Sequence, residues 1–119
     1  NACGLSCDAS GAGALSKVLG ALRSKFKGKI VTAAITADAS TGGKMDKADY
    51  AGASKQVNWF NVMTYDFFGA WAAAGPTAPH PPLRSYPGIP QQGSNSADAI
   101  AKLKKKGVPA GKMLLGVGF

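Results

Sequence analysis

The chain has 119 residues, 45% hydrophobic and 17% charged, which is the composition of a globular protein of single-domain length and excludes the disordered and fibrous classes. It contains no apolar run of about 18 residues and no basic stretch leading into an apolar segment at the N-terminus, so we expect neither a membrane span nor a signal peptide in these residues. The net charge of +8 comes mostly from Lys, and only Arg23 and Arg84 could make the bidentate contact to guanine typical of specific DNA-binding proteins, so we expect no nucleic-acid partner.

Two cysteines lie near the start of the chain, Cys3 and Cys7, in a segment with Gly and Ser. With no other Cys and one distant His, this segment lacks the ligands for a metal site, and we expect no metal and no cofactor. A short local disulfide is favoured over two free thiols. If the bridge forms, the protein is secreted.

The first half of the chain predicts two helix and strand pairs. Apolar residues recur at helical spacing after Ser10, a candidate N-cap, and Gly28 is placed to end this helix. Residues 30–37 are short, β-branched and apolar, which is typical of a parallel strand covered on both faces. After a loop, Asp46 is a candidate cap for a second helix, and residues 59–66 predict a second buried strand.

A long irregular segment follows at residues 67–93. Its many prolines exclude a helix or a central strand, and a connection of this length in a compact protein is usually functional. A third helix is predicted to begin at Ser94 or Asn95 and to end at Gly107. Its last turns carry a lysine run, Lys102 with residues 104–106, which we expect to be a solvated face near the negative end of the helix dipole.

The third predicted strand, residues 112–119, completes an alternation of helices and strands. This order predicts right-handed crossovers and a parallel sheet. Three strands that are apolar on both faces would leave open edges, so we infer a piece of a larger α/β domain. A barrel of eight such units needs about 250 residues. A doubly wound sheet stays possible, although Gly11-Ala-Gly13 follows no strand and lacks the third glycine of a phosphate-binding loop.

Polar and aromatic residues gather after the second predicted strand. Alternation places Met63 and Tyr65 on one face, and Asp66 ends the strand at the edge where barrels carry catalytic groups. Phe67 and Trp71 add flat apolar surfaces beside these polar groups, a combination that suits a sugar ring. For Met63 and Phe67, packing is favoured over contact with a ligand.

The stretch that carries these residues resembles a known family. Val57-Asn-Trp-Phe-Asn-Val-Met-Thr-Tyr-Asp-Phe-Phe-Gly-Ala-Trp71 is similar to the sixth-strand segment of the family 18 glycoside hydrolases, the chitinases, whose motif is Met-x-Tyr-Asp followed by an aromatic-Gly-x-aromatic turn. Residues 31–37, 75–83 and 107–119 resemble, in the same order, the fifth strand, the long loop and the approach to the seventh strand. The sequence, rich in Ala, Gly and Lys, is most similar to those of secreted actinobacterial chitinases.

This resemblance implies an α/β fold that is part of a (β/α)8 TIM barrel, from the helix after strand 4 into strand 7. Residues 1–119 would then be an incomplete segment of a single catalytic domain. It also implies endo-type, retaining hydrolysis of β-1,4-N-acetylglucosamine linkages in chitin, in which the substrate's own acetamido oxygen attacks the anomeric carbon. The expected partners are chitin and N-acetylglucosamine oligomers. The complete protein is expected to be an extracellular monomer.

The resemblance also implies roles for individual residues. Tyr65 would bond the acetamido oxygen, and Asp66 would orient the sugar and adjust the electrostatics of the acid. Met63 would pack beneath the sugar, and Trp71 would stack on the leaving-group side. His80, the only His, lies in the proline-rich loop, where a loop hydrogen bond is favoured over catalysis.

The family's general acid is a Glu in the motif Asp-x-x-Asp-x-Asp-x-Glu after the fourth strand. The sequence contains no such motif, and its six acidic residues are all Asp. We therefore expect these residues alone to be inactive, because proton transfer contributes about 10² to 10⁴-fold to such reactions. A second interpretation stays open, in which the protein is a non-catalytic chitin-binding lectin of the same fold.

Overall fold

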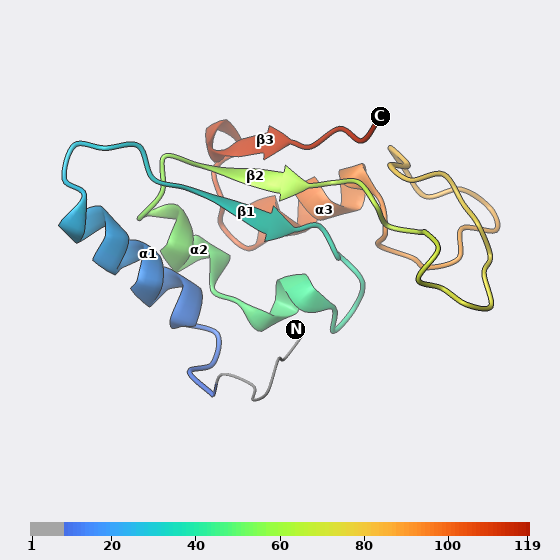
Figure 1. The fold of residues 1–119 in the computed structure, drawn as a ribbon, viewed down its shortest axis with the longest axis horizontal. Coiled ribbons are helices and arrows are strands. Elements are labelled where there is room, and N and C mark those ends of the chain that lie inside the picture. The colour runs from blue at the N-terminus through green and yellow to red at the C-terminus, as the bar shows by residue number, and fades with distance from the viewer. Residues whose placement is uncertain (1–8) are drawn as a thin grey trace.

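The computed structural model describes residues 9–119, which form a three-stranded parallel sheet with helices packed against it (Figure 1). Cys3 and Cys7 lie outside the described residues, so their disulfide stays a prediction. Along the chain the helices, 3₁₀ turns and strands are α1 (Ala14–Lys25), β1 (Thr32–Thr36), η1 (Lys44–Lys47), α2 (Tyr50–Ser54), β2 (Trp59–Met63), α3 (Ser96–Lys105), η2 (Ala110–Lys112) and β3 (Met113–Leu115). No helix in the described part of the chain is long and apolar enough to cross a membrane.

The sheet has the order β1-β2-β3, with β2 in the centre and both pairings parallel. Ile35 pairs with Val62, and Asn61 pairs with Leu114. The three predicted strands are therefore confirmed, together with the parallel alternation of strand and helix. Each strand is shorter than predicted, because the apolar pattern continues into residues that no longer pair with a neighbour.

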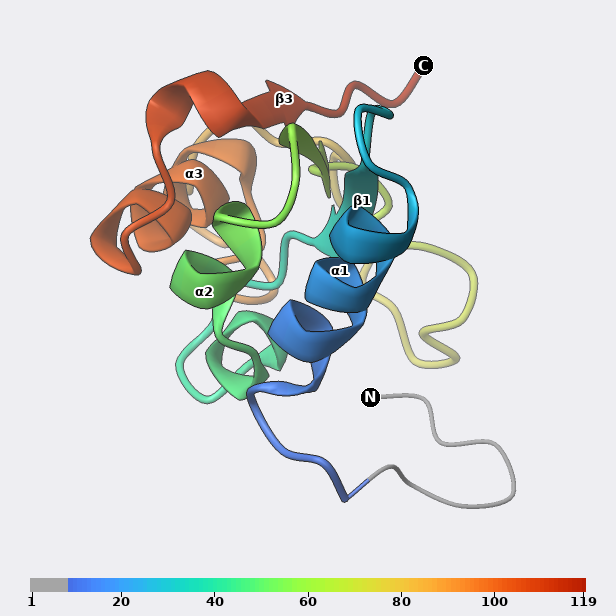
Figure 2. The ribbon, with the colours of Figure 1, turned by 90° about the vertical axis from the view of Figure 1, so that its left-hand side faces the viewer.

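The core lies on one face of the sheet. Ile35, Phe60 and Val62 point to this face and pack with residues of the three helices, among them Leu19, Tyr50, Ala53, Ala99 and Leu103. Tyr50 meets Phe60 edge to face, with ring centroids 6.0 Å apart. Figure 2 shows α1, α2 and α3 gathered on this side of the sheet.

The other face of the sheet is open in the described residues, although the apolar pattern is typical of strands covered on both faces. Thr32, Ala34 and Asn61 are exposed there, and Met63 is 37% exposed. Cover on one face alone is the arrangement of a barrel segment, since helices surround the outside of a barrel and the inner face is closed only by the remaining strands.

Helix α1 begins later than the sequence predicts. It starts at Ala14 with Gly13 at its N-cap position, so Ser10 is not the cap. The helix ends at Lys25, and Gly28 follows with a φ of +76°, a backbone conformation that glycine adopts without strain. Of its apolar stripe only Leu19 is fully buried.

Helix α2 is capped by Asp49 and not by Asp46. The Asp49 carboxylate accepts a hydrogen bond from the Gly52 amide at 2.8 Å, and the helix covers only Tyr50–Ser54. The sequence placed the cap three residues too early, because residues 44–47 form a 3₁₀ turn before the α-helix begins. Asp46 instead lies in η1.

Helix α3 is capped by Asn95, one of the two residues at which the sequence predicted it to begin. The buried Asn95 accepts a hydrogen bond from the Asp98 amide at 2.9 Å, and Gly107 follows the helix with a φ of +89°. The described residues between 64 and 95 contain no helix or strand, which confirms the predicted irregular segment.

Lys102 is not part of a solvated face, contrary to prediction. Its ammonium donates to the carbonyl oxygens of Ala39 at 3.2 Å and Ser40 at 2.8 Å and to the Asp46 carboxylate at 2.7 Å. Its side chain is only 19% exposed. Lys102 therefore connects α3 to the loop after β1, whereas Lys104 and residue 105 are exposed as predicted.

Two further cations bind backbone carbonyls at the opposite end of the sheet. Lys112 donates to the carbonyl oxygens of Ser54 at 2.6 Å and Val57 at 2.8 Å. Arg23 donates to the Gln56 carbonyl oxygen at 2.9 Å and to the Asn58 side-chain oxygen at 2.7 Å. These contacts hold the segment between α2 and β2 against α1 and η2.

The contact between Asp46 and Lys102 should make stability depend on pH. The hydrogen bond from Lys102 holds the pKa of the Asp46 carboxyl below its usual value. Its stabilising effect is therefore present above about pH 4, the unfolded pKa, and is lost as the pH falls below that value. Asp46→Asn should lower the midpoint of urea unfolding at pH 7, and its difference from wild type should be smaller at pH 3.

Lysine variants provide the control for this measurement. Lys102→Met removes the ammonium and should also destabilise at pH 7, whereas Lys104→Met, on an exposed position of the same helix, should have little effect. A deficit of Asp46→Asn that is equally large at both pH values would show that the charged pair is not its cause.

Candidate functional site

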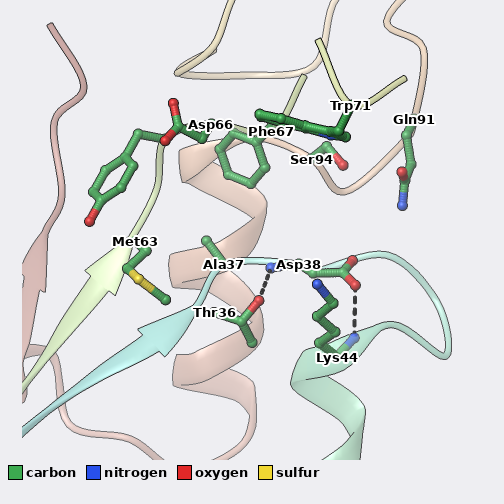
Figure 3. Close-up of a pocket in the computed structure, with 11 residues that line it drawn as sticks. Thr36, Ala37, Asp38, Lys44, Met63, Asp66, Phe67, Trp71, Gln91 and Ser94 are labelled. Atoms are coloured by element: carbon green, nitrogen blue, oxygen red, sulfur yellow. Dashed lines mark hydrogen bonds between the residues drawn. The ribbon is translucent and has the colours of Figure 1, made fainter. Parts of the chain in front are cut away.

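A cavity of about 500 Å³ opens where β1 and β2 end (Figure 3). Its lining includes all four residues that the sequence proposed for a site, Met63, Tyr65, Asp66 and Trp71. Thr36, Ala37, Asp38, Lys44, Phe67, Gln91 and Ser94 complete it. The pocket thus combines the carboxyl ends of two neighbouring strands with two separate parts of the irregular segment.

Thr64 determines how the chain leaves β2. Its side chain is fully buried, and its hydroxyl donates to the Gly116 carbonyl oxygen at 2.7 Å. The Gly116 amide in turn donates to the Val62 carbonyl oxygen at 2.9 Å. Because Thr64 points into the protein, its neighbours Met63 and Tyr65 are left on the side of the pocket.

The Tyr65 ring lies directly against the backbone that follows β3. A Cβ atom added at Gly116 would lie 2.7 Å from Tyr65 Cε1, and one added at Gly118 would lie 2.9 Å from Tyr65 Cβ. Both separations are too short for real side chains. The two glycines therefore leave the space that the tyrosine occupies.

Among the residues that the structure describes, Asp66 is the only non-glycine residue with a positive φ, which is 52°. Its side chain is 62% exposed, and Oδ1 lies 3.0 Å from Nδ1 of His80. The Asp66 amide also donates to His80 Nδ1 at 3.2 Å. The prediction that His80 makes a loop hydrogen bond is confirmed, but the sequence did not indicate that its partner is a proposed site residue.

The aromatic residues of the pocket divide into two kinds. Trp71 is 67% exposed, its ring lies over Gly69, and Figure 3 shows it edge-on at the upper rim. Phe67 is half-buried and packs against the core. Met63 belongs to the pocket and not to the core cluster, so its side chain is available at the site.

The opposite side of the pocket contains residues that sequence reasoning missed. Asp38 follows β1, and its carboxylate accepts from the amides of Ser40 at 3.2 Å and Lys44 at 2.8 Å. Partial burial raises the pKa of Asp38, but the hydrogen bonds from Ser40 and Lys44 outweigh it and leave the pKa below its usual value. The sequence could have indicated Asp38 as a site residue, because it directly follows a predicted strand.

Gln91 and Ser94 also reach the pocket, from the end of the irregular segment. No local pattern identified them, because their approach depends on how the long connection returns to α3. Within residues 9–119, no group of three or more His, Cys, Asp or Glu side chains is placed to bind a metal ion.

Two chitinases of Streptomyces are similar to this chain in sequence. The chain is 63% identical to Chitinase C of Streptomyces lividans and 62% identical to Chitinase 63 of Streptomyces plicatus, over 121 aligned residues that include the whole chain. It spans only 20% of the length of either protein.

A solved structure has the same arrangement of elements. A mutant of catalytic domain 2 of the Ostrinia furnacalis Group II chitinase, in complex with (NAG)5, matches with a TM-score of 0.76 and 25% identity. The match covers 86% of this chain and 26% of that one. Together with the family, such structures place the three-stranded sheet in a (β/α)8 barrel fold.

The profile of the family described as Glycosyl hydrolases family 18 matches residues 6–119, which confirms the resemblance seen in the sequence. The chain therefore belongs to glycosyl hydrolases family 18.

Proposed function

We propose that the protein containing this chain is a chitinase, which hydrolyses β-1,4-N-acetylglucosamine linkages by endo-type, retaining, substrate-assisted chemistry. The observation that carries the proposal is the pocket in which Met63, Tyr65, Asp66 and Trp71 meet at the end of β2. The chitinase names of its relatives and the (NAG)5 complex of a similar structure support the same substrate class.

Tyr65 is proposed to act on the reacting part of the substrate. Its hydroxyl would donate to the acetamido oxygen as that oxygen attacks the anomeric carbon and forms the cyclic intermediate. The close packing of Tyr65 against Gly116 and Gly118 supports this role, because a donor that is already held in place needs little reorganisation in the transition state.

Asp66 is proposed to orient the same sugar and to adjust the electrostatics of the general acid. Its carboxylate lies at the pocket beside Tyr65 and is exposed enough to meet a ligand. Met63 would pack beneath the sugar at the cleavage point. Trp71, with most of its ring exposed, would stack on a sugar on the leaving-group side.

In the barrel, we propose that α1 is the helix after the fourth strand and that β1, β2 and β3 are strands five, six and seven. The open face of the sheet would then face the barrel interior. The general acid must come from outside these 119 residues, since they contain no Glu. Residues 1–119 would form an incomplete segment of one catalytic domain.

The lectin interpretation is not favoured, since the similar proteins are named chitinases. The expected partners are chitin and N-acetylglucosamine oligomers, and we propose a secreted protein that is a monomer when complete.

Hydrolysis of (GlcNAc)5 tests the proposed function. The full-length protein should release a mixture of shorter oligomers, with the β-anomer formed first because the reaction retains configuration. The 119-residue chain alone should release none. Chromatography and NMR of the products measure both results. Turnover by the short chain would contradict the assignment of the general acid, and no turnover by the full-length protein would contradict the function.

Tyr65→Phe in the full-length enzyme should separate chemistry from binding. Loss of one preorganised donor should lower kcat by about 10² to 10³-fold, with much less effect on KM. Trp71→Ala should mainly raise KM, because it removes a stacking surface. Tyr86→Phe, the same change outside the pocket, is the control. A Tyr65→Phe enzyme that keeps more than about a third of wild-type kcat would refute the role of Tyr65.

The predicted disulfide bears on the proposed secretion. Cys3 and Cys7 should be bridged in exported protein, where the bond would contribute roughly 2 kcal/mol because the loop is short. Mass spectrometry without reduction distinguishes the two states. Two free thiols in protein exported by its native host would rule the bridge out.

A further inference from the structure

Asp66 has a backbone conformation that needs support from its surroundings. Its φ of 52° lies in the left-handed region, which disfavours residues with a Cβ atom. Such conformations persist where neighbouring contacts hold them, and they gather at functional sites. The contacts that the structure places on Asp66 come from a residue fourteen positions later, His80.

A single nitrogen of His80 reaches both the backbone and the side chain of Asp66. Nδ1 lies 3.2 Å from the Asp66 amide nitrogen and 3.0 Å from Oδ1. When Nδ1 carries no proton it can accept from the amide, and when it carries one it can donate to the carboxylate. Either form of the imidazole therefore has a hydrogen-bond partner on Asp66.

His80 is itself held by the chain around it. The carbonyl oxygens of Pro82 and Leu83, just after it, accept from the amides of Ser96 at 3.0 Å and Ala97 at 2.9 Å, in the first turn of α3. On its other side, a Cβ added at Gly118 would lie 3.7 Å from His80 Cε1. The imidazole thus lies between a segment bonded to a helix and the backbone that packs on Tyr65.

We propose that His80 is a positioning residue for the reaction, which holds the Asp66 carboxylate in the orientation that the substrate requires. This inference rests on the proposed function. Without the imidazole, an aspartate that is 62% exposed would turn freely into solvent, and its backbone would lose a support for the left-handed conformation. Misplacement of an orienting group by about 1 Å can cost up to about 10²-fold in rate.

Side-chain length offers a sharp test in the full-length enzyme. The amide of Asn can reach the position of Nδ1, whereas the amide of Gln corresponds to Nε2 and lies one carbon farther out. His80→Ala and His80→Gln should lower kcat on (GlcNAc)5 by about 10-fold or more, with KM within about twofold of wild type. His80→Asn should stay within about threefold of wild-type kcat. Thr77→Ala, an exposed position of the same loop, is the control.

Hydrogen exchange at the Asp66 amide provides a readout that does not depend on turnover. Mass spectrometry with site-resolving fragmentation should find slow exchange in wild type and His80→Asn and faster exchange in His80→Ala and His80→Gln. If wild type is inactive on (GlcNAc)5, the proposed function fails and the exchange rates alone decide whether His80 holds Asp66.

Several results would overturn the proposal. These are wild-type kcat in His80→Ala, a His80→Asn enzyme no better than His80→Gln, a rise in KM at constant kcat, or equal exchange at Asp66 in all variants. The His80→Asn variant also separates positioning from a general loss of folding, because it keeps a polar side chain of similar size at the same place.

Discussion

The buried hydroxyl of Thr64 is the contact on which the candidate site depends. It donates to the Gly116 carbonyl oxygen from a position with no exposure to solvent, and a buried polar group left without such a partner costs about 1 to 3 kcal/mol. The side chain is therefore held inward. Since neighbouring residues of an extended chain point to opposite sides, the inward Thr64 directs Met63 and Tyr65 to the pocket. The hydroxyl thus determines the direction of the two residues that flank it.

The same contact makes the geometry of the site depend on both β2 and β3. Gly116 is joined to Val62 through its amide and to Thr64 through its carbonyl oxygen, so the backbone after β3 follows the end of β2 closely. This close approach is possible because Gly116 and Gly118 have no side chains beside Tyr65. The chemistry proposed for Tyr65 therefore depends on residues far along the chain that touch no substrate.

The features that sequence predicted well are those with a local cause. Apolar periodicity located the three helices and strands, and alternation placed Met63 and Tyr65 on one face, because both patterns arise from backbone geometry alone. The choice of Asp49 over Asp46 as a cap depends on where a turn of 3₁₀ helix ends. The site residues Gln91 and Ser94, and the contact of His80 with Asp66, depend on the path of a long loop. No local pattern specifies that path.

Lys102 shows that tertiary contacts can give a charged residue a structural role that its sequence context does not indicate. In the sequence it belongs to a run of surface lysines, yet it shares with Lys112 the role of a donor to backbone carbonyls. A lysine in such contacts must break them before its nitrogen can attack an acylating reagent. Amine-reactive reagents should therefore label the exposed lysines first, and late labelling of Lys102 and Lys112 would report that α3 and η2 are still docked on the sheet.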